Sequence, residues 1–536
     1  MKKFFQGIGE IFKVIGNWCK NHKTLVALIA TALFVLSQIP LLVNHEIWSD
    51  EAIPWEISKQ ITPENIYELN DAEPHPLLWE LILAPFSKNN FPVITLNIIS
   101  LVIVSLALFL FLRFAPINPF LKLLFIFSNA FFYYNPIIAR DYCLVPLSLA
   151  LIGMTYKNRH EKPLRYALSL VFLSQTHFLM YGLLAILALG FIIEEIKSEH
   201  KLGKTATNLL KIMLPVGLSI LTVLPMVFGS FENHALITGK IFENSPYKID
   251  LFPVFEITIL GMDNIVLNIA LLVVVGLFLI SLLAENAKIA FYFVASVGFW
   301  LFVMLMVYQG YYLLEQKCSL LTMIVLVSLW LLILEPKPKK ENLFSKLLNF
   351  SEIVKFARVH VKNPISILAF VLVFATIPTT LANATWDLSG SFSHSKENSD
   401  YVNSLEKNSA IIEVDNFAYE QFDVATRVLI NSDVTIYNLP DDSYTNIGYG
   451  LKYNSEYVEK NRERVVVDPA EVEAKIAEFS KNYEHVYVMV NSGRVYCNHY
   501  ERSIPDWLKQ YEITTELDIN EYRVPSQVPT LVFKAK

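Results

Sequence analysis

The chain has 536 residues, of which 54% are hydrophobic and only 18% are charged, and its formal net charge is −6. A soluble protein of this size carries about a quarter charged residues, so the composition excludes a wholly soluble chain and a disordered one. The slight acidic excess excludes a polybasic nucleic-acid-binding protein. An integral membrane protein with an attached soluble part remains.

The charges are unevenly distributed along the chain. From Asn383 onward the sequence carries 15 Lys/Arg and 25 Asp/Glu, whereas the 382 residues before it carry 29 and 25. The last part therefore has the charge density of an ordinary globular domain. We expect a membrane domain over residues 24–382 and a soluble domain over residues 383–536.

The segment 1–23 has Phe and Ile at helical spacing with lysines between them, which predicts an amphipathic helix on the inner membrane surface. Beyond it, about eleven apolar runs are candidates for membrane-spanning helices. These runs are residues 24–44, 94–114, 119–134, 142–156, 166–176, 178–193, 211–229, 265–284, 289–308, 319–334 and 365–382.

The distribution of Lys and Arg predicts the orientation. With the N-terminus inside, the inner segments hold 23 of these residues and the outer loops hold 6, and such a bias marks the cytoplasmic side. The C-terminal domain is then extracytoplasmic. Its sequence predicts an α/β fold, with a helix over 470–480 that starts at Asp468-Pro469 and strands at 410–414, 434–437, 485–490 and 529–533.

The first outer loop, residues 45–90, is long and strongly acidic. Asp50 and Glu51 follow the membrane exit, and Glu73 and His75 precede the next apolar segment. Carboxylates at a membrane surface can act as general bases. Alternatively, Asp50, Glu73 and His75 together can hold a divalent cation. The plainest alternative is a solvated acidic loop without a further role.

Three other outer turns contain isolated polar residues. Arg140 can bind a phosphate through two N–H groups, or it can pair with Asp141 or reach toward lipid headgroups. His177 lies at a break between two spans, where a lone histidine is more often structural than a ligand. Lys317 can meet a lipid phosphate or only mark the interface. Because these features share one membrane face with the acidic loop, they predict a site for a phosphorylated, lipid-linked substrate.

Motifs for nucleotide chemistry are absent from the sequence. Gly203-Lys204-Thr205 resembles the end of a phosphate-binding loop, but Ser198 stands where its first glycine is required. The sequence also contains neither HExxH nor GxSxG. We therefore expect no nucleotide cofactor, and neither a pump nor a protease.

The order of the outer motifs resembles the GT-C superfamily of polytopic glycosyltransferases, in particular protein O-mannosyltransferases and lipid A aminoarabinose transferases. The similarity covers residues 24–200 in its motifs and residues 200–382 in topology alone. Where the family usually has His-Pro-Pro, this chain has His-Pro-Leu. The motifs are Asp50-Glu51-Ala52, Glu73-Pro74-His75-Pro76-Leu77-Leu78, Ala139-Arg140-Asp141-Tyr142 and Thr176-His177.

The resemblance implies Asp50 as the catalytic base, Glu73 as a second acid beside His75, and Arg140 as a contact of the donor phosphate. At the position of Lys317 the family often has an Arg or a His. We assign Asp50, Glu51 and Glu73 to catalysis. Arg140, Lys317 and His177 are assigned to the donor phosphate, and His75 with Glu73 to a divalent cation if one is used.

These expectations describe a multi-pass transferase of the bacterial cytoplasmic membrane. It would move a sugar, with inversion, from a polyprenyl-phosphate donor to a glycan, lipid or protein acceptor on the outer face. A lipid or glycan flippase is the main alternative, but it predicts polar residues deep within the spans, where the sequence has few. A surface receptor that binds a ligand through its C-terminal domain leaves the acidic first loop unexplained.

Overall fold

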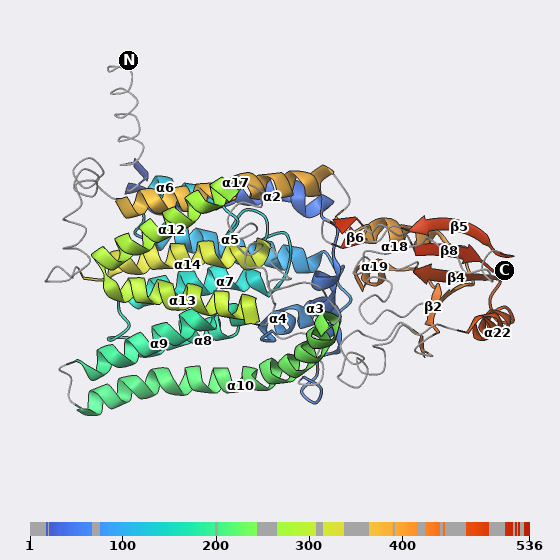
Figure 1. Cartoon of the computed structure of the whole chain (residues 1–536), viewed down its shortest axis with the longest axis horizontal. Coiled ribbons are helices and arrows are strands. Elements are labelled where there is room, and N and C mark those ends of the chain that lie inside the picture. Colours follow the sequence, from blue (N-terminus) through green and yellow to red (C-terminus); the bar gives the residue numbers. More distant parts are fainter. Residues whose placement is uncertain are drawn as a thin grey trace, which may run out of the picture.

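The computed structural model describes residues 18–19, 21–66, 75–198, 202–243, 265–306, 315–336, 364–389, 392–414, 424–439, 443–444, 468–491, 510–517, 520–521, 524–525 and 530–535. The predicted helix over residues 1–23 lies largely outside these ranges. Long apolar helices run side by side along the longest axis of the molecule, and a small sheet lies at one end of the bundle (Figure 1). We call that end the sheet-side end and the opposite one the far end.

Within the described ranges, seven helices are long and apolar enough to cross a membrane, which agrees with a membrane-embedded protein. They are α2 (Lys23–Asn44), α5 (Thr95–Phe114), α9 (Tyr181–Ile196, with the 3-10 turn η3 at Phe178–Met180 before it), α10 (Leu202–Glu243), α13 (Ala287–Met306), α14 (Glu315–Leu334) and α17 (Pro364–Ser389). A further apolar helix, α12 (Ile265–Glu285), packs against α13 and α17.

The expected span over 119–134 is not a spanning helix. Helix α6 (Pro119–Ile126) has only eight residues, and residues 127–140 return toward the sheet-side end through turns. Side-chain hydrogen bonds replace the helical ones here: the Asn135 amide donates to the Ala130 carbonyl at 2.8 Å, and the Ser128 hydroxyl donates to the Phe125 carbonyl at 2.7 Å. Asn and Ser side chains compete with helices in this way.

Two further helices are too short to cross the membrane. Helix α7 (Leu144–Tyr156) and helix α8 (Pro163–Ser174) have 13 and 12 residues, and at about 1.5 Å per residue each reaches about 20 Å, against a hydrocarbon core of about 30 Å. Helix α7 ends and helix α8 begins at the far end of the bundle. The remaining length toward the sheet is occupied by α3 (Ser49–Gln60) and α4 (Leu78–Ser87) (Figure 1). Residues at the sheet-side ends of α7 and α8 are therefore recessed within the protein.

The short helices are fixed by close packing against their longer neighbours. Helix α7 contacts α14 at Gly153, where a Cβ atom would lie 2.5 Å from the ring of the buried Trp330. Small residues that let helices approach closely are typical of membrane bundles. The packing sets the position of α7, and hence of the residues just before it.

The C-terminal domain is an α/β unit, as predicted. Its six-stranded sheet has the order β3-β2-β1-β4-β8-β5, with β1 parallel to β2 and β4 and the other neighbours antiparallel. The four expected strands are present, and α22 (Pro469–Phe479) begins where Asp468 accepts a hydrogen bond from the Ala470 N–H at 2.9 Å. The strands are β1 (Ser409–Glu413), β2 (Thr435–Asn438), β3 (Ser443–Tyr444), β4 (His485–Asn491), β5 (Glu512–Leu517) and β8 (Thr530–Lys534).

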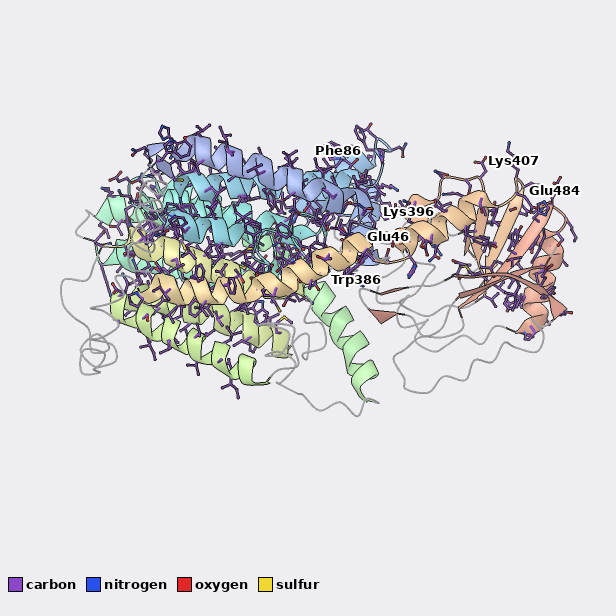
Figure 2. All side chains as sticks on the ribbon, turned by 90° about the horizontal axis from the view of Figure 1, so that it is seen from above. Glu46, Phe86, Trp386, Lys396, Lys407 and Glu484 are labelled. Carbon is purple, nitrogen blue, oxygen red and sulfur yellow. The ribbon has the colours of Figure 1, made fainter. Side chains whose placement is uncertain are left out.

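The C-terminal domain contacts the bundle through two parts of the sequence, the segment after α2 and the segment after α17. Helix α17 continues past Asn383, where the charge density changes, and ends at Ser389. The backbone N–H groups of Ser393 and His394 then donate to the Glu46 carboxylate at 3.1 and 2.9 Å, and Figure 2 shows Glu46 at this junction. Beyond it follow α18 (Ser395–Ser404) and α19 (Val424–Leu429), and α19 packs on α3.

Candidate functional site

The first turn of α3 carries two neighbouring carboxylates that have different environments. Helix α2 ends at Asn44 and α3 begins at Ser49, so Asp50 and Glu51 lie at the start of the new helix. Successive helical residues point about 100° apart. Accordingly, the Glu51 side chain is fully buried, whereas 35% of the Asp50 side chain is exposed.

Glu51 is held by four donors. Its Oε1 accepts hydrogen bonds from the Ala139 N–H at 2.7 Å and from the Asn97 amide at 3.0 Å. Its Oε2 accepts from the Trp48 N–H at 3.2 Å and lies 2.9 Å from Nε2 of His45. These four contacts fix the position of the carboxylate and occupy both of its oxygens. The geometry favours a positioning role for Glu51 over the catalytic role expected from the sequence.

His45 links the start of α3 to the end of α17. Its Nε2 lies 2.9 Å from Glu51, and its Nδ1 lies 2.9 Å from Asp387, which also accepts a hydrogen bond from the Tyr133 hydroxyl at 3.0 Å. Only the imidazolium form can donate from both ring nitrogens. Burial alone would lower the pKa of His45, but the charges of Glu51 and Asp387 outweigh it and raise the pKa to about 10.

Asp50 and Arg140 form an ion pair. The guanidinium of Arg140 donates to the Asp50 carboxylate, and it also lies 5.6 Å from the centroid of the Tyr142 ring. Arg140 is 6% exposed, so its guanidinium is enclosed by protein, which favours the ion pair over the snorkelling alternative. A buried guanidinium in this position can bind oxyanions with strong, directional hydrogen bonds.

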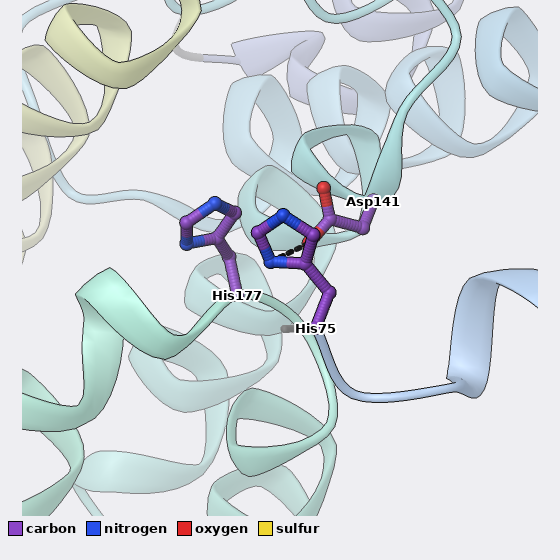
Figure 3. A group of neighbouring side chains, drawn as sticks. All are labelled: His75, Asp141 and His177. Atoms are coloured by element: carbon purple, nitrogen blue, oxygen red, sulfur yellow. Dashed lines mark ion pairs between the residues drawn. The ribbon is translucent and has the colours of Figure 1, made fainter. Parts of the chain in front are cut away.

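Two histidines and an aspartate meet beside this ion pair (Figure 3). The Nδ1 atom of His75 lies 3.6 Å from the Asp141 carboxylate, and the rings of His75 and His177 are 4.6 Å apart between centroids. All three side chains are buried, and one ligand atom from each lies within 4.8 Å of the others. His75 arrives from the segment before α4, Asp141 precedes α7, and His177 follows α8.

The hydrogen bonding of His177 defines its tautomer. Its Nδ1 accepts from the Leu179 N–H at 3.1 Å, so the proton of the neutral ring lies on Nε2. Burial and the positive charges of His75, Lys317 and Arg140 lower the pKa of His177 well below its usual value. Its Nε2 is buried and has no hydrogen-bond partner among the residues described. A buried N–H of this kind suits an anionic oxygen better than a metal ion, which needs a nitrogen lone pair.

Lys317 lies near the start of α14, and its position is set by its neighbour. The Gln316 amide donates to two carbonyl groups of the 134–138 turn, at 2.6 and 2.9 Å, and thereby fixes α14 next to Arg140. The Lys317 side chain is buried. Its ammonium is close enough to Arg140 and Asp50 for their charges to act on it. Cationic groups from two separate elements therefore share the space around Asp50.

Most of the residues selected from the sequence are brought together by the fold. We call the following set the polar cluster: Asp50, His75, Arg140, Asp141, His177 and Lys317. Glu73 lies outside the described residues. The sequence indicates Asp141 only as a partner for Arg140, although its place directly after that residue is a usable signal. No sequence pattern indicates His45 or Asp387.

Comparison of the chain with protein-family models gave no match, and no curated protein matches it at a significant level. The relationship to GT-C glycosyltransferases therefore stays a prediction that rests on the sequence motifs.

Proposed function

We propose that this protein is a GT-C-type membrane glycosyltransferase that uses a polyprenyl-phosphate-linked sugar. One observation carries the proposal: the partly exposed carboxylate of Asp50 is paired with buried Arg140, beside the donor groups of His177 and Lys317. Transfer from a sugar phosphate needs one general base and several donors for the phosphate oxygens. The polar cluster contains this combination in a recessed position.

In the proposed reaction, Arg140, Lys317 and the Nε2–H of His177 bind the donor phosphate. An acceptor hydroxyl or amine attacks the anomeric carbon and transfers its proton to Asp50, while the bond from that carbon to the phosphate oxygen breaks. Polyprenyl phosphate leaves, and its negative charge is stabilised by the same donors. When Arg140 turns from Asp50 to the phosphate, Asp50 becomes available as the base. The ion pair thus couples donor binding to base activation.

The expected divalent cation finds only part of a ligand set in the described residues. His75 and Asp141 offer a nitrogen and an oxygen at 3.6 Å from each other, and Glu73 lies outside the described residues. The third candidate, His177, has its Nδ1 lone pair engaged by the Leu179 N–H. No step of the proposed reaction depends on a metal ion.

We propose that the protein lies in a bacterial cytoplasmic membrane with the sheet-side end outside, because the described basic residues between α7 and α8 and at the start of α10 lie at the far end (Figure 1). The polar cluster and the C-terminal domain then share the outer side. This places the reaction where activated, lipid-linked sugars meet glycan, lipid or protein acceptors.

A flippase is the second candidate, because buried charged groups within a helical bundle also suit the passage of a phosphorylated headgroup. The two functions differ in their products. A transferase consumes the donor by breaking the bond between sugar and phosphate, whereas a flippase moves the donor between leaflets intact.

The test uses full-length protein in proteoliposomes with radiolabelled polyprenyl-phosphate sugars and mixed acceptors. Asp50→Asn is expected to lower transfer by about 10²–10⁴-fold, as loss of a general base commonly does. Glu56→Gln, on the same helix and paired with Lys59 near the surface, is the matched control and should retain activity. Full activity of Asp50→Asn would refute the assignment. Donor movement across the bilayer without loss of the sugar would favour the flippase.

A further inference from the structure

A second polar site lies at the far end of the bundle. A cavity of about 600 Å³ opens between the turn that joins α7 to α8 and the first turns of α10. Its lining includes His160 and Glu161 from the turn and Lys204, Thr207, Asn208 and Lys211 from α10. Nothing in the proposed transfer reaction uses these residues.

The floor of this cavity is a well-ordered hydrogen-bond network. The Asn208 side chain is buried, and its amide donates to both oxygens of Glu195 at 3.2 and 3.3 Å. His160 lies 2.7 Å from Glu195 through Nδ1 and 3.1 Å from Glu194 through Nε2. The hydrogen bond with Glu194 raises the pKa of His160, and burial only partly opposes it. The cavity is therefore built on a network in which His160 is held by two acids.

The acidic groups beneath the cavity are already matched by cations. Glu194 accepts two hydrogen bonds from the Arg159 guanidinium, at 2.9 and 3.0 Å, and one from Lys288 at 2.5 Å. Glu335 accepts from Arg159 at 2.9 Å and pairs with Lys288 at 2.5 Å. The described lining of the cavity contains two lysines, Lys204 and Lys211, and one acid, Glu161, so it favours an anion over a cation.

An apolar strip continues from the rim along α10. Leu210, Met213 and Leu214 are 62%, 48% and 54% exposed and follow the cavity within about one turn of the helix. A free phosphate ion has no use for such a strip, whereas acyl chains pack on it when the headgroup is in the cavity. Basic pockets on the cytoplasmic side of helical bundles are suited to acidic lipid headgroups.

We propose that this cavity binds the phosphate of an anionic phospholipid headgroup from the leaflet at the far end. Lys204 and Lys211 contact the phosphate oxygens, Thr207 and Asn208 form the polar wall, and the acyl chains lie along α10. The bound lipid contacts both α10 and the turn between α7 and α8. Two residues of the polar cluster flank these short helices: Asp141 precedes α7 and His177 follows α8. The proposal rests on membrane insertion and does not require transferase activity.

The test measures retention of single lipids by delipidated, full-length protein in detergent, using native mass spectrometry. Wild-type protein should bind phosphatidylglycerol in preference to phosphatidylcholine. Lys204→Gln/Lys211→Gln should weaken binding roughly 30-fold, about fivefold for each lysine near the headgroup. Both side chains are exposed, so the substitutions leave the core unchanged.

The matched control is Lys157→Gln/Lys197→Gln, which removes two exposed lysines at the same end that do not line the cavity. It should retain binding within about twofold, because exposed charges at a distance are screened. Equal losses in both double variants would overturn the proposal in favour of general surface charge. A parallel arm with inorganic phosphate separates the two sources of the anion: phosphate binding with no preference among lipids would overturn the lipid assignment.

Discussion

Removal of the His45 side chain should destabilise the protein in a pH-dependent manner. In the folded protein the imidazolium lies between Glu51 and Asp387 at 2.9 Å from each, with 1% of its side chain exposed. His45→Ala leaves two buried carboxylates without their shared cation, and breaking a buried ion pair in this way commonly costs about 3–5 kcal/mol.

The pKa of His45 gives a second measure of the same effect. A rise from 6.5 to about 10 corresponds to a stabilisation of about 5 kcal/mol at about 1.36 kcal/mol per pH unit. Because the folded pKa is the higher one, this contribution is complete below pH 6.5 and is lost as the pH rises through 10. The stability difference between wild-type protein and His45→Ala should therefore be largest near pH 6 and shrink toward pH 10.

The assay is thermal unfolding of detergent-solubilised protein, followed by tryptophan fluorescence at several pH values. His394→Ala is the control, since its partner Glu397 is 66% exposed and surface ion pairs contribute about 1 kcal/mol or less. Adding Glu51→Gln and Asp387→Asn to His45→Ala should restore part of the loss by removing the uncompensated charges. A difference that is independent of pH, or no larger than that of the control, would refute this reasoning.

Three further variants test the bundle and the site. Arg140→Ala should weaken donor use by removing a charge-assisted contact, with a higher KM for the donor in the transfer assay; unchanged KM and kcat would remove Arg140 from the site. Transfer by wild-type protein should be insensitive to chelators, because no step of the proposed reaction uses a metal ion. Wild-type activity that is sensitive to chelators and is lost in His75→Ala would instead assign a divalent cation to the site. Gly153→Ala should destabilise the protein by about 1–3 kcal/mol because its Cβ meets Trp330, whereas Gly217→Ala, with open space around it, should be neutral or stabilising in thermal unfolding.

The membrane helices and the C-terminal strands could be predicted because their patterns are local. Long apolar runs mark spans such as α5 and α14, and short apolar runs between polar segments mark β1 and β4. The apolar composition of the run at 119–134 hides Ser128, and Asn135 follows the run directly; both side chains donate to backbone carbonyls in turns that replace the helix. Helix α3 was not predicted, because its sequence is polar and contains Pro54.

The site was only partly predictable. The orientation predicted from Lys and Arg places the turns of Asp50, Arg140, His177 and Lys317 on one side of the membrane. This shared side indicates that the four residues lie near one another. The ion pair between Asp50 and Arg140 and the burial of the polar cluster could not be predicted from the sequence. They depend on the short lengths of α7 and α8, which place the ends of these helices inside the protein. The contact between His45 and Asp387 spans 342 positions, and no local pattern connects residues so far apart.

The most direct test of the central claim follows the donor itself. Wild-type protein in vesicles is supplied with a polyprenyl-phosphate sugar and an acceptor mixture, and the lipid products are measured by mass spectrometry. Free polyprenyl phosphate should appear in a one-to-one ratio with glycosylated acceptor, and Asp50→Asn should lower the yield of both by about 10²–10⁴-fold. Donor that remains intact in the presence of active, folded protein and every acceptor class would contradict it.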